Sequence, residues 1–120
     1  MKIRLVDDNP IYGAALSSQL QAIGYECTYS STALSESEIE DCSLVLMDLH
    51  FHSLNGFEQG SQMPQGQRKK LLLYSFHARS TDSAWAEAIG LGKVLAFPMP
   101  GKQLHEEIVQ RVGLSEAVEI

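Results

Sequence analysis

The sequence is short of cysteine, of basic residues and of long apolar runs, and each shortage excludes a class of protein. The two cysteines of its 120 residues, Cys27 and Cys42, have no CxxC spacing, so we expect small buried side chains rather than a redox pair. No apolar run approaches the roughly 20 residues of a membrane span, and no signal-like segment opens the chain. We therefore expect a cytoplasmic protein with no membrane partner, stabilised by core packing alone.

Basic residues are outnumbered, which argues against direct nucleic-acid binding by this chain. Nine Lys and Arg stand against fifteen Asp and Glu, for a net charge of −6, whereas phosphate contacts need clustered cations. The single basic run, Arg68 to Lys70, abuts an apolar stretch. We interpret it as the solvated entrance to a strand, with a phosphate-binding patch as the alternative.

What the sequence does contain is an alternation of short apolar runs with helical signals, typical of one compact domain over residues 1–120. Residues 113–120 are expected to be a tail or the start of a linker. The expected strands are Ile3 to Val6, Tyr25 to Tyr29, Ser43 to Met47, Leu71 to Tyr74 and Val94 to Phe97. Strands this apolar, alternating with helices, predict a doubly wound α/β domain with a parallel sheet covered on both faces.

Helix boundary residues support this alternation. The first expected helix has Asn9 as N-cap and Pro10 at its first position, and it ends at Ile23 and Gly24. Further helices are expected at Ser35 to Asp41, Ser80 to Ile89 and Lys102 to Val112. Between Gly56 and Arg68, two glycines and a proline limit any helix to about two turns.

Polar residues gather where the expected strands end, which in such folds is where functional groups lie. The stretch LVDDNP places Asp7 and Asp8 after the first strand, and Asp48 and Ser75 follow the third and fourth. Three carboxylates at one edge repel one another, and a hard divalent cation such as Mg²⁺ is the simplest neutraliser. The alternative is that Asp7 and Asp8 only begin a turn and cap the next helix.

The order DD, D, S and a proline-bearing fifth strand resembles the receiver domain of two-component response regulators. RLVDDNPIYGAAL is similar to the family's first strand and helix, Gly56 stands eight residues after Asp48, and FPMPGKQL fits the passage into the last helix. The resemblance covers nearly the whole chain. It implies a flavodoxin-like, three-layer α/β/α fold with five parallel strands in the order 2-1-3-4-5.

The resemblance also implies a site and a function. Asp48 would be nucleophile and phosphoacceptor, and Ser75 would hydrogen-bond the new phosphoryl group. Asp8, Asp48 and the backbone carbonyl of His50 would bind Mg²⁺, or alternatively Mn²⁺, with Asp7 acting mainly through water. The domain would take part in phosphorelay signal transduction and would be no enzyme beyond Mg²⁺-dependent self-phosphorylation and dephosphorylation.

The implied partners are a histidine kinase or phosphotransfer protein as donor and an output protein or domain as recipient. A homodimer through the last helix and strand is left open. Trp85 is either partly buried or an exposed anchor for a partner. The loop histidines, His50, His52 and His77, are expected to be solvated, with a transition-metal site as the alternative.

Two positions depart from the family pattern. Phe97 replaces the lysine that receivers usually carry before the fifth-strand proline, so a charge toward acceptor and phosphoryl oxygens is missing. Neither Lys93 nor Lys102 matches that position. Val94 stands where many receivers have a switch aromatic. These departures favour an alternative function, a pseudo-receiver that binds proteins without being phosphorylated.

Overall fold

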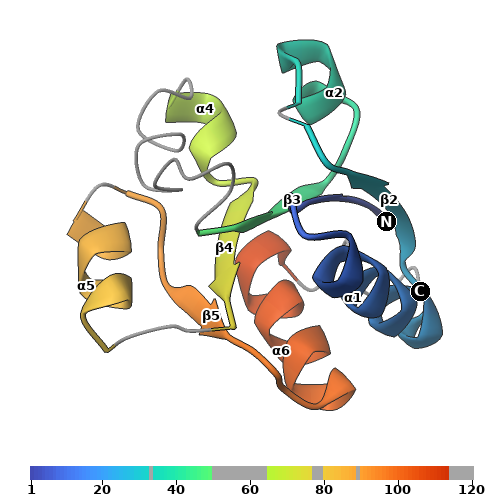
Figure 1. The fold of residues 1–120 in the computed structure, drawn as a ribbon. Helices are drawn as coiled ribbons and strands as arrows, with labels where there is room; N and C mark the ends of the chain where they lie inside the picture. Colours follow the sequence, from blue (N-terminus) through green and yellow to red (C-terminus); the bar gives the residue numbers. More distant parts are fainter. Residues whose placement is uncertain (33, 50–64, 77–79, 89, 114–120) are drawn as a thin grey trace.

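The structure is a computed structural model that describes residues 1–32, 34–49, 65–76, 80–88 and 90–113. Strands and helices alternate along the chain (Figure 1). In chain order they are β1 (Lys2–Val6), α1 (Pro10–Ile23), β2 (Glu26–Ser30), α2 (Glu36–Glu40), β3 (Leu44–Asp48), α4 (Gln65–Arg68), β4 (Leu71–Ser75), α5 (Ser80–Ala88), β5 (Val94–Ala96) and α6 (Gly101–Val112).

The five strands form one parallel sheet in the order β2-β1-β3-β4-β5, which confirms the predicted fold class. The order reverses at β1, because the chain first moves to β2 and then returns past β1 to β3. Functional groups in such sheets gather at this reversal, beyond the carboxyl ends of the central strands. Here those ends belong to β1 and β3.

Two apolar cores lie on opposite faces of the sheet, because side chains alternate in direction along each strand. Helices α1 and α6 cover one face, with Leu16, Leu20, Leu104 and Ile108 packed on a core that includes Ile3, Leu5, Tyr74 and Phe97. The other face packs against Ala86 of α5 and Ile39 of α2. Figure 1 shows the sheet between these two layers.

Helix α1 begins and ends where its capping residues predict. The Asn9 side chain accepts hydrogen bonds from the amides of Ile11 and Tyr12, at 3.0 and 3.3 Å. Gly24 ends the helix at a φ of 116°, a left-handed conformation that glycine adopts without steric cost. After Gly24 the chain turns and enters β2. At its other end, α1 begins just after Asp7 and Asp8.

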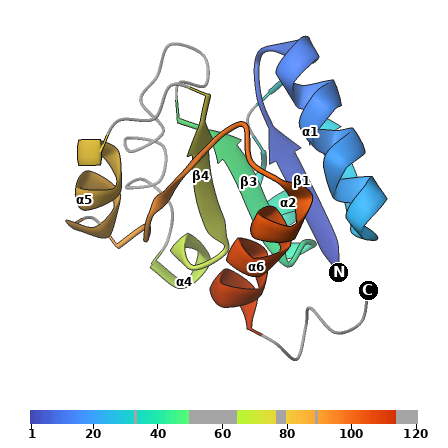
Figure 2. The ribbon, with the colours of Figure 1, turned by 90° about the horizontal axis from the view of Figure 1, so that it is seen from below.

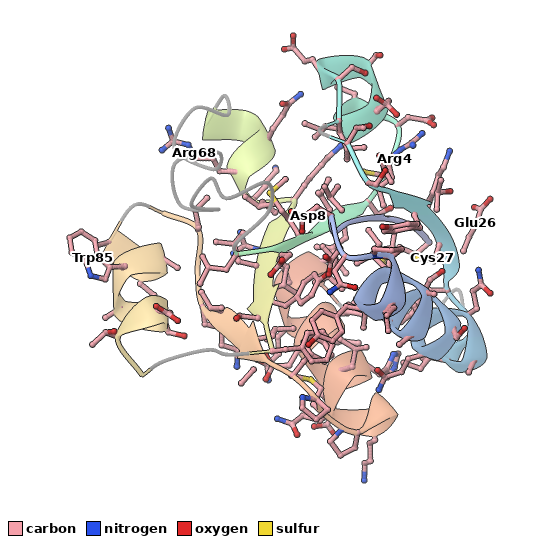
Figure 3. The ribbon with its side chains drawn as sticks, in the orientation of Figure 1. Arg4, Asp8, Glu26, Cys27, Arg68 and Trp85 are labelled. Carbon is pink, nitrogen blue, oxygen red and sulfur yellow. The ribbon has the colours of Figure 1, made fainter. Side chains whose placement is uncertain are left out.

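Several sequence-based expectations need correction or fall outside the described residues. Trp85 is 64% exposed, so it is not a core residue, and Figure 3 shows it pointing away from α5. His105 on α6, which we expected to be a helix-surface residue, is half-buried, and its Nδ1 lies 2.7 Å from the Tyr25 hydroxyl. Of the segment between Gly56 and Arg68, the structure describes only α4, a single turn. Among the described residues, no helix combines the length and apolarity that crossing a bilayer requires.

Candidate functional site

Three carboxylates lie together at the reversal point of the sheet. Asp7 and Asp8 follow β1, Asp48 ends the adjacent β3, and one carboxylate oxygen of each lies within 4.8 Å of the other two. Asp7 is buried, Asp48 is half-buried and Asp8 is exposed. Figure 3 marks Asp8 where the chain leaves β1. The juxtaposition follows from topology, since neighbouring parallel strands end at the same edge.

Asp7 is held in place by hydrogen bonds at every polar atom. Its Oδ1 accepts from the Asn9 amide at 2.8 Å, and its Oδ2 accepts from the Tyr74 hydroxyl at 2.5 Å. Its backbone carbonyl accepts from the Tyr29 hydroxyl at 2.7 Å, and its amide donates to Ser30 at 3.2 Å. Asp7 is therefore a fixed, buried acceptor, whereas Asp8 is exposed and Asp48 is half-buried.

The two tyrosines are part of the site and were missed by sequence reasoning. Burial, the hydrogen bond to Asp7 and the nearby charges of Asp7 and Asp48 raise the pKa of Tyr74 well above its usual range. Burial and the charges of Asp7 and Asp8 also raise the pKa of Tyr29. Both hydroxyls therefore stay protonated at neutral pH and remain donors. A hydroxyl in the otherwise apolar strand LLLYS was the available signal, because buried tyrosine hydroxyls need partners.

Ser75 closes β4 at the same edge of the sheet. It is buried, its carbonyl accepts a hydrogen bond from the Phe97 amide at 2.9 Å, and its preceding residue Tyr74 stands in register with Asp48. The structure thus brings Ser75 to the neighbouring strand end beside the acceptor candidate. The role of its hydroxyl remains a prediction.

Phe97 belongs to an aromatic cluster, by which we mean the rings of Tyr12, Tyr74, Phe76 and Phe97. Tyr12 stacks on Phe76 with ring centroids 4.2 Å apart. Phe97 meets Tyr74 edge to face at 5.4 Å and Phe76 at 5.6 Å. The peptide bond between Phe97 and Pro98 is cis. Phe97 is buried in the α1/α6 core, so an apolar ring fills this position and no charge reaches the carboxylates from it.

Of the other residues named from the sequence, some are described by the structure and some lie outside the described residues. Lys93 is bound to Glu107 at 2.6 Å, which holds it before β5, away from the strand end where Phe97 lies. Lys102 is exposed on α6. Val94, the first residue of β5, is buried in the core on the α2/α5 face of the sheet. His50, His52, Gly56 and His77 lie outside the described residues.

The donor set of the site fits a hard divalent cation. Three carboxylates supply only oxygen atoms, which Mg²⁺ prefers, and a cation would offset the repulsion among three neighbouring negative charges. Asp7 is fully buried and accepts two protein hydrogen bonds on its side chain, whereas Asp8 is the exposed member of the cluster. The indirect, water-mediated role of Asp7 stays a prediction.

Comparison with known proteins identifies the fold. No protein-family model matches the sequence, and a search of curated proteins finds no significant match. Solved structures do match. A CheY-like receiver domain protein from Methanospirillum hungatei is 20% identical with a TM-score of 0.76, over 98% of this chain and 96% of that one. CheY4 of Vibrio cholerae is 22% identical with a TM-score of 0.74, over 92% and 97%.

A third similar structure contains a modified residue and bound ligands. It is a response regulator protein from Burkholderia pseudomallei, with a phosphorylated aspartic acid, a calcium ion and citrate. It is 17% identical with a TM-score of 0.65, over 98% of this chain and 69% of that one. At these identities the likeness establishes architecture. The chain has the fold of response regulator receiver domains, as its sequence predicts.

Proposed function

We propose that this chain is a receiver domain that accepts a phosphoryl group on Asp48 and thereby switches a protein-interaction surface. The observation that carries the proposal is the carboxylate cluster at the reversal point of a receiver fold, with Asp48 at the end of β3. Carboxylates gathered this closely repel one another, so their assembly needs a compensating role. The phosphorylated aspartic acid and calcium ion of the Burkholderia pseudomallei structure support the same chemistry here.

In the proposed step, a carboxylate oxygen of Asp48 attacks the phosphorus of a phosphohistidine or a small phosphodonor. An O–P bond forms as the bond from phosphorus to the donor breaks, and the leaving group keeps the electron pair: imidazole, which then takes a proton, or acetate when acetyl phosphate is the donor. Bound Mg²⁺, held by Asp8, Asp48 and the His50 carbonyl, would supply compensation for the charge on the transferring group. The Ser75 hydroxyl then donates a hydrogen bond to a phosphoryl oxygen.

Phe97 sets the expected rate. Without the usual lysine, one charge-assisted contact to the phosphoryl oxygens is lost, which by analogy with a missing oxyanion-hole donor costs about 2–4 kcal/mol. At 1.36 kcal/mol per tenfold, phosphorylation should be slower by roughly 30- to 1,000-fold than with a lysine in place. We therefore expect slow modification that still depends on Asp48.

The second candidate function is a pseudo-receiver that binds a protein partner without phosphorylation. The aromatic cluster favours it, because Phe97 is packed against Tyr74 and Phe76 and contributes to the core. In either case we propose a cytoplasmic signalling domain with an output protein or domain as partner. The first function adds a histidine kinase or phosphotransfer protein as donor.

Intact-mass measurement after incubation with Mg²⁺ and acetyl phosphate separates the two functions. A phosphate-sized gain is expected for the native chain and for Asp41→Asn, whose carboxylate lies on the surface paired with Lys2. No gain is expected for Asp48→Asn. A gain in Asp48→Asn equal to that of the native chain would contradict Asp48 as acceptor.

A second pair of variants tests the role of Phe97. Phe97→Lys restores the charge, and Phe97→Met keeps an apolar side chain as a control for altered packing. If the native chain and Phe97→Met gain no mass while Phe97→Lys does, the pseudo-receiver is the correct function. Circular dichroism checks that each variant still folds after the change in the aromatic cluster.

A further inference from the structure

A second polar site lies at the other end of the sheet, where β3 and β4 begin. It is a pocket of about 280 Å³ lined by Cys42, Ser43, Lys69, Lys70, Arg111 and Val112, which we call the basic pocket. Ser43 precedes β3 and Lys70 precedes β4, whereas the carboxylates follow the strands. Figure 2 shows the last turn of α6 near the start of β4. The basic pocket and the carboxylate cluster are thus separated by the length of the sheet.

Arg111 is oriented within this pocket but incompletely satisfied. Its Nη2 donates to the carbonyls of Arg68 and Leu71, each at 2.8 Å, which fixes the plane of the guanidinium. Its Nε is buried and has no hydrogen-bond partner among the described residues. Burial also lowers the pKa of the Arg111 guanidinium. A buried donor without a partner is costly, so an anion that reaches it would be favoured.

Lys70 is likewise held by neutral groups. Its ammonium donates to the carbonyls of Ile39 and Glu40 at 3.2 and 3.3 Å, and these contacts orient the charge without neutralising it. The nearby Asp41 carboxylate is occupied by Lys2 at 2.7 Å and by Arg4 at 3.7 Å. Among the described residues that line the pocket, none is acidic. A protein with net charge −6 therefore concentrates three cations around one small cavity.

We propose that the basic pocket binds a phosphate dianion, either inorganic phosphate or the phosphate of a small phosphomonoester. One arginine charge and two lysine point charges around one pocket suit a phosphate dianion. The volume of about 280 Å³ lies just below the usual range for drug-sized ligands, which suits a compact anion. The run of Arg68 to Lys70 alone only suggested a phosphate patch; Arg111, from the end of α6, adds a third charge to the lining of the pocket.

The proposal is independent of aspartate phosphorylation and is tested without magnesium. Amide resonances are followed by ¹H–¹⁵N NMR during titration with inorganic phosphate or glycerol 3-phosphate, with EDTA present and ionic strength held constant with NaCl. We expect saturable shifts at Cys42, Ser43, Lys70 and Leu71. The tighter of the two titrants identifies the source of the dianion, and acetate serves as the singly charged comparison.

Variants assign the binding to the pocket. Arg111→Gln should weaken phosphate binding at least tenfold. Lys69→Gln, at an exposed position, should weaken it several-fold. Lys102→Gln, at an exposed position on α6, is the control and should leave the affinity unchanged. If Arg111→Gln does not fold, the double variant Lys69→Gln and Lys70→Gln decides the matter. Non-saturable shifts, shifts confined to Asp7, Asp8 and Asp48, equal affinity for acetate, or equal weakening by Lys102→Gln would each overturn the proposal.

Discussion

The hydrogen bond from Tyr74 to Asp7 should be one of the largest single polar contributions to stability in this fold. Both side chains are fully buried, and the hydroxyl lies 2.5 Å from Oδ2 of the carboxylate. Tyr74→Phe keeps the ring in the aromatic cluster and removes only the donor. Because hydrogen bonds to charged groups contribute about 1.5–3 kcal/mol and a buried acceptor is left behind, we expect a loss of about 2–3 kcal/mol.

The assay is denaturant or thermal unfolding in the absence of divalent cations. At about 4 °C per kcal/mol for a domain of this length, Tm should fall by about 8–12 °C. Tyr12→Phe is the matched control, because Tyr12 is a partly exposed member of the same cluster. A loss in Tyr74→Phe no greater than that in Tyr12→Phe would refute the reasoning.

Magnesium should restore part of the stability that Tyr74→Phe loses. Without the Tyr74 donor, Oδ2 of Asp7 becomes a stronger ligand for a cation or for its bound water, so saturating Mg²⁺ should raise the Tm of Tyr74→Phe more than that of the native chain. Equal Mg²⁺-dependent shifts in the two proteins would mean that Asp7 does not contribute to cation binding.

Two further predictions concern packing and pH. Gly13→Ala should destabilise the protein by about 1–2 kcal/mol despite the better helix propensity of alanine, because a Cβ at Gly13 would lie within 3 Å of the Tyr29 ring. Gly66→Ala is the control, because a Cβ there meets open space, and this variant should be neutral or stabilising. Equal stability of both variants in urea titrations would contradict this packing. Burial raises the pKa of Tyr25 above its value in the unfolded chain, so its contribution is fully present below about pH 10 and is lost as pH rises through the native pKa. Tyr25→Phe should therefore lose stability less steeply between about pH 9.5 and 11, and a slope equal to that of the native chain would show that Tyr25 is not responsible.

Local signals explain why much of the fold was predictable from sequence. Asn9, Pro10 and Gly24 define α1 through contacts within a few residues, and Ser35 forms the capping box of α2 with Glu38. Strand runs such as LLLYS are apolar enough to be recognised alone. The carboxylate cluster then follows from topology, because β1 and β3 are adjacent and parallel.

The parts that sequence could not provide are contacts between distant segments. Tyr74 and Asp7 are 67 residues apart, and Tyr25 and His105 are 80 apart, so no local pattern links them. Trp85 was ambiguous because a tryptophan in a short helix fits either a core or a surface. The basic pocket needed the end of α6 to meet the start of β4, which places Arg111 beside Lys70.

The most direct test of the central claim is to locate the phosphoryl group. After incubation with Mg²⁺ and acetyl phosphate, borohydride reduction converts an aspartyl phosphate to homoserine, which tandem mass spectrometry then assigns to a position. The account predicts homoserine at position 48, with aspartate retained at positions 7 and 8. Homoserine at position 7 or 8, or at none of the three while Phe97→Lys also remains unmodified, would contradict it.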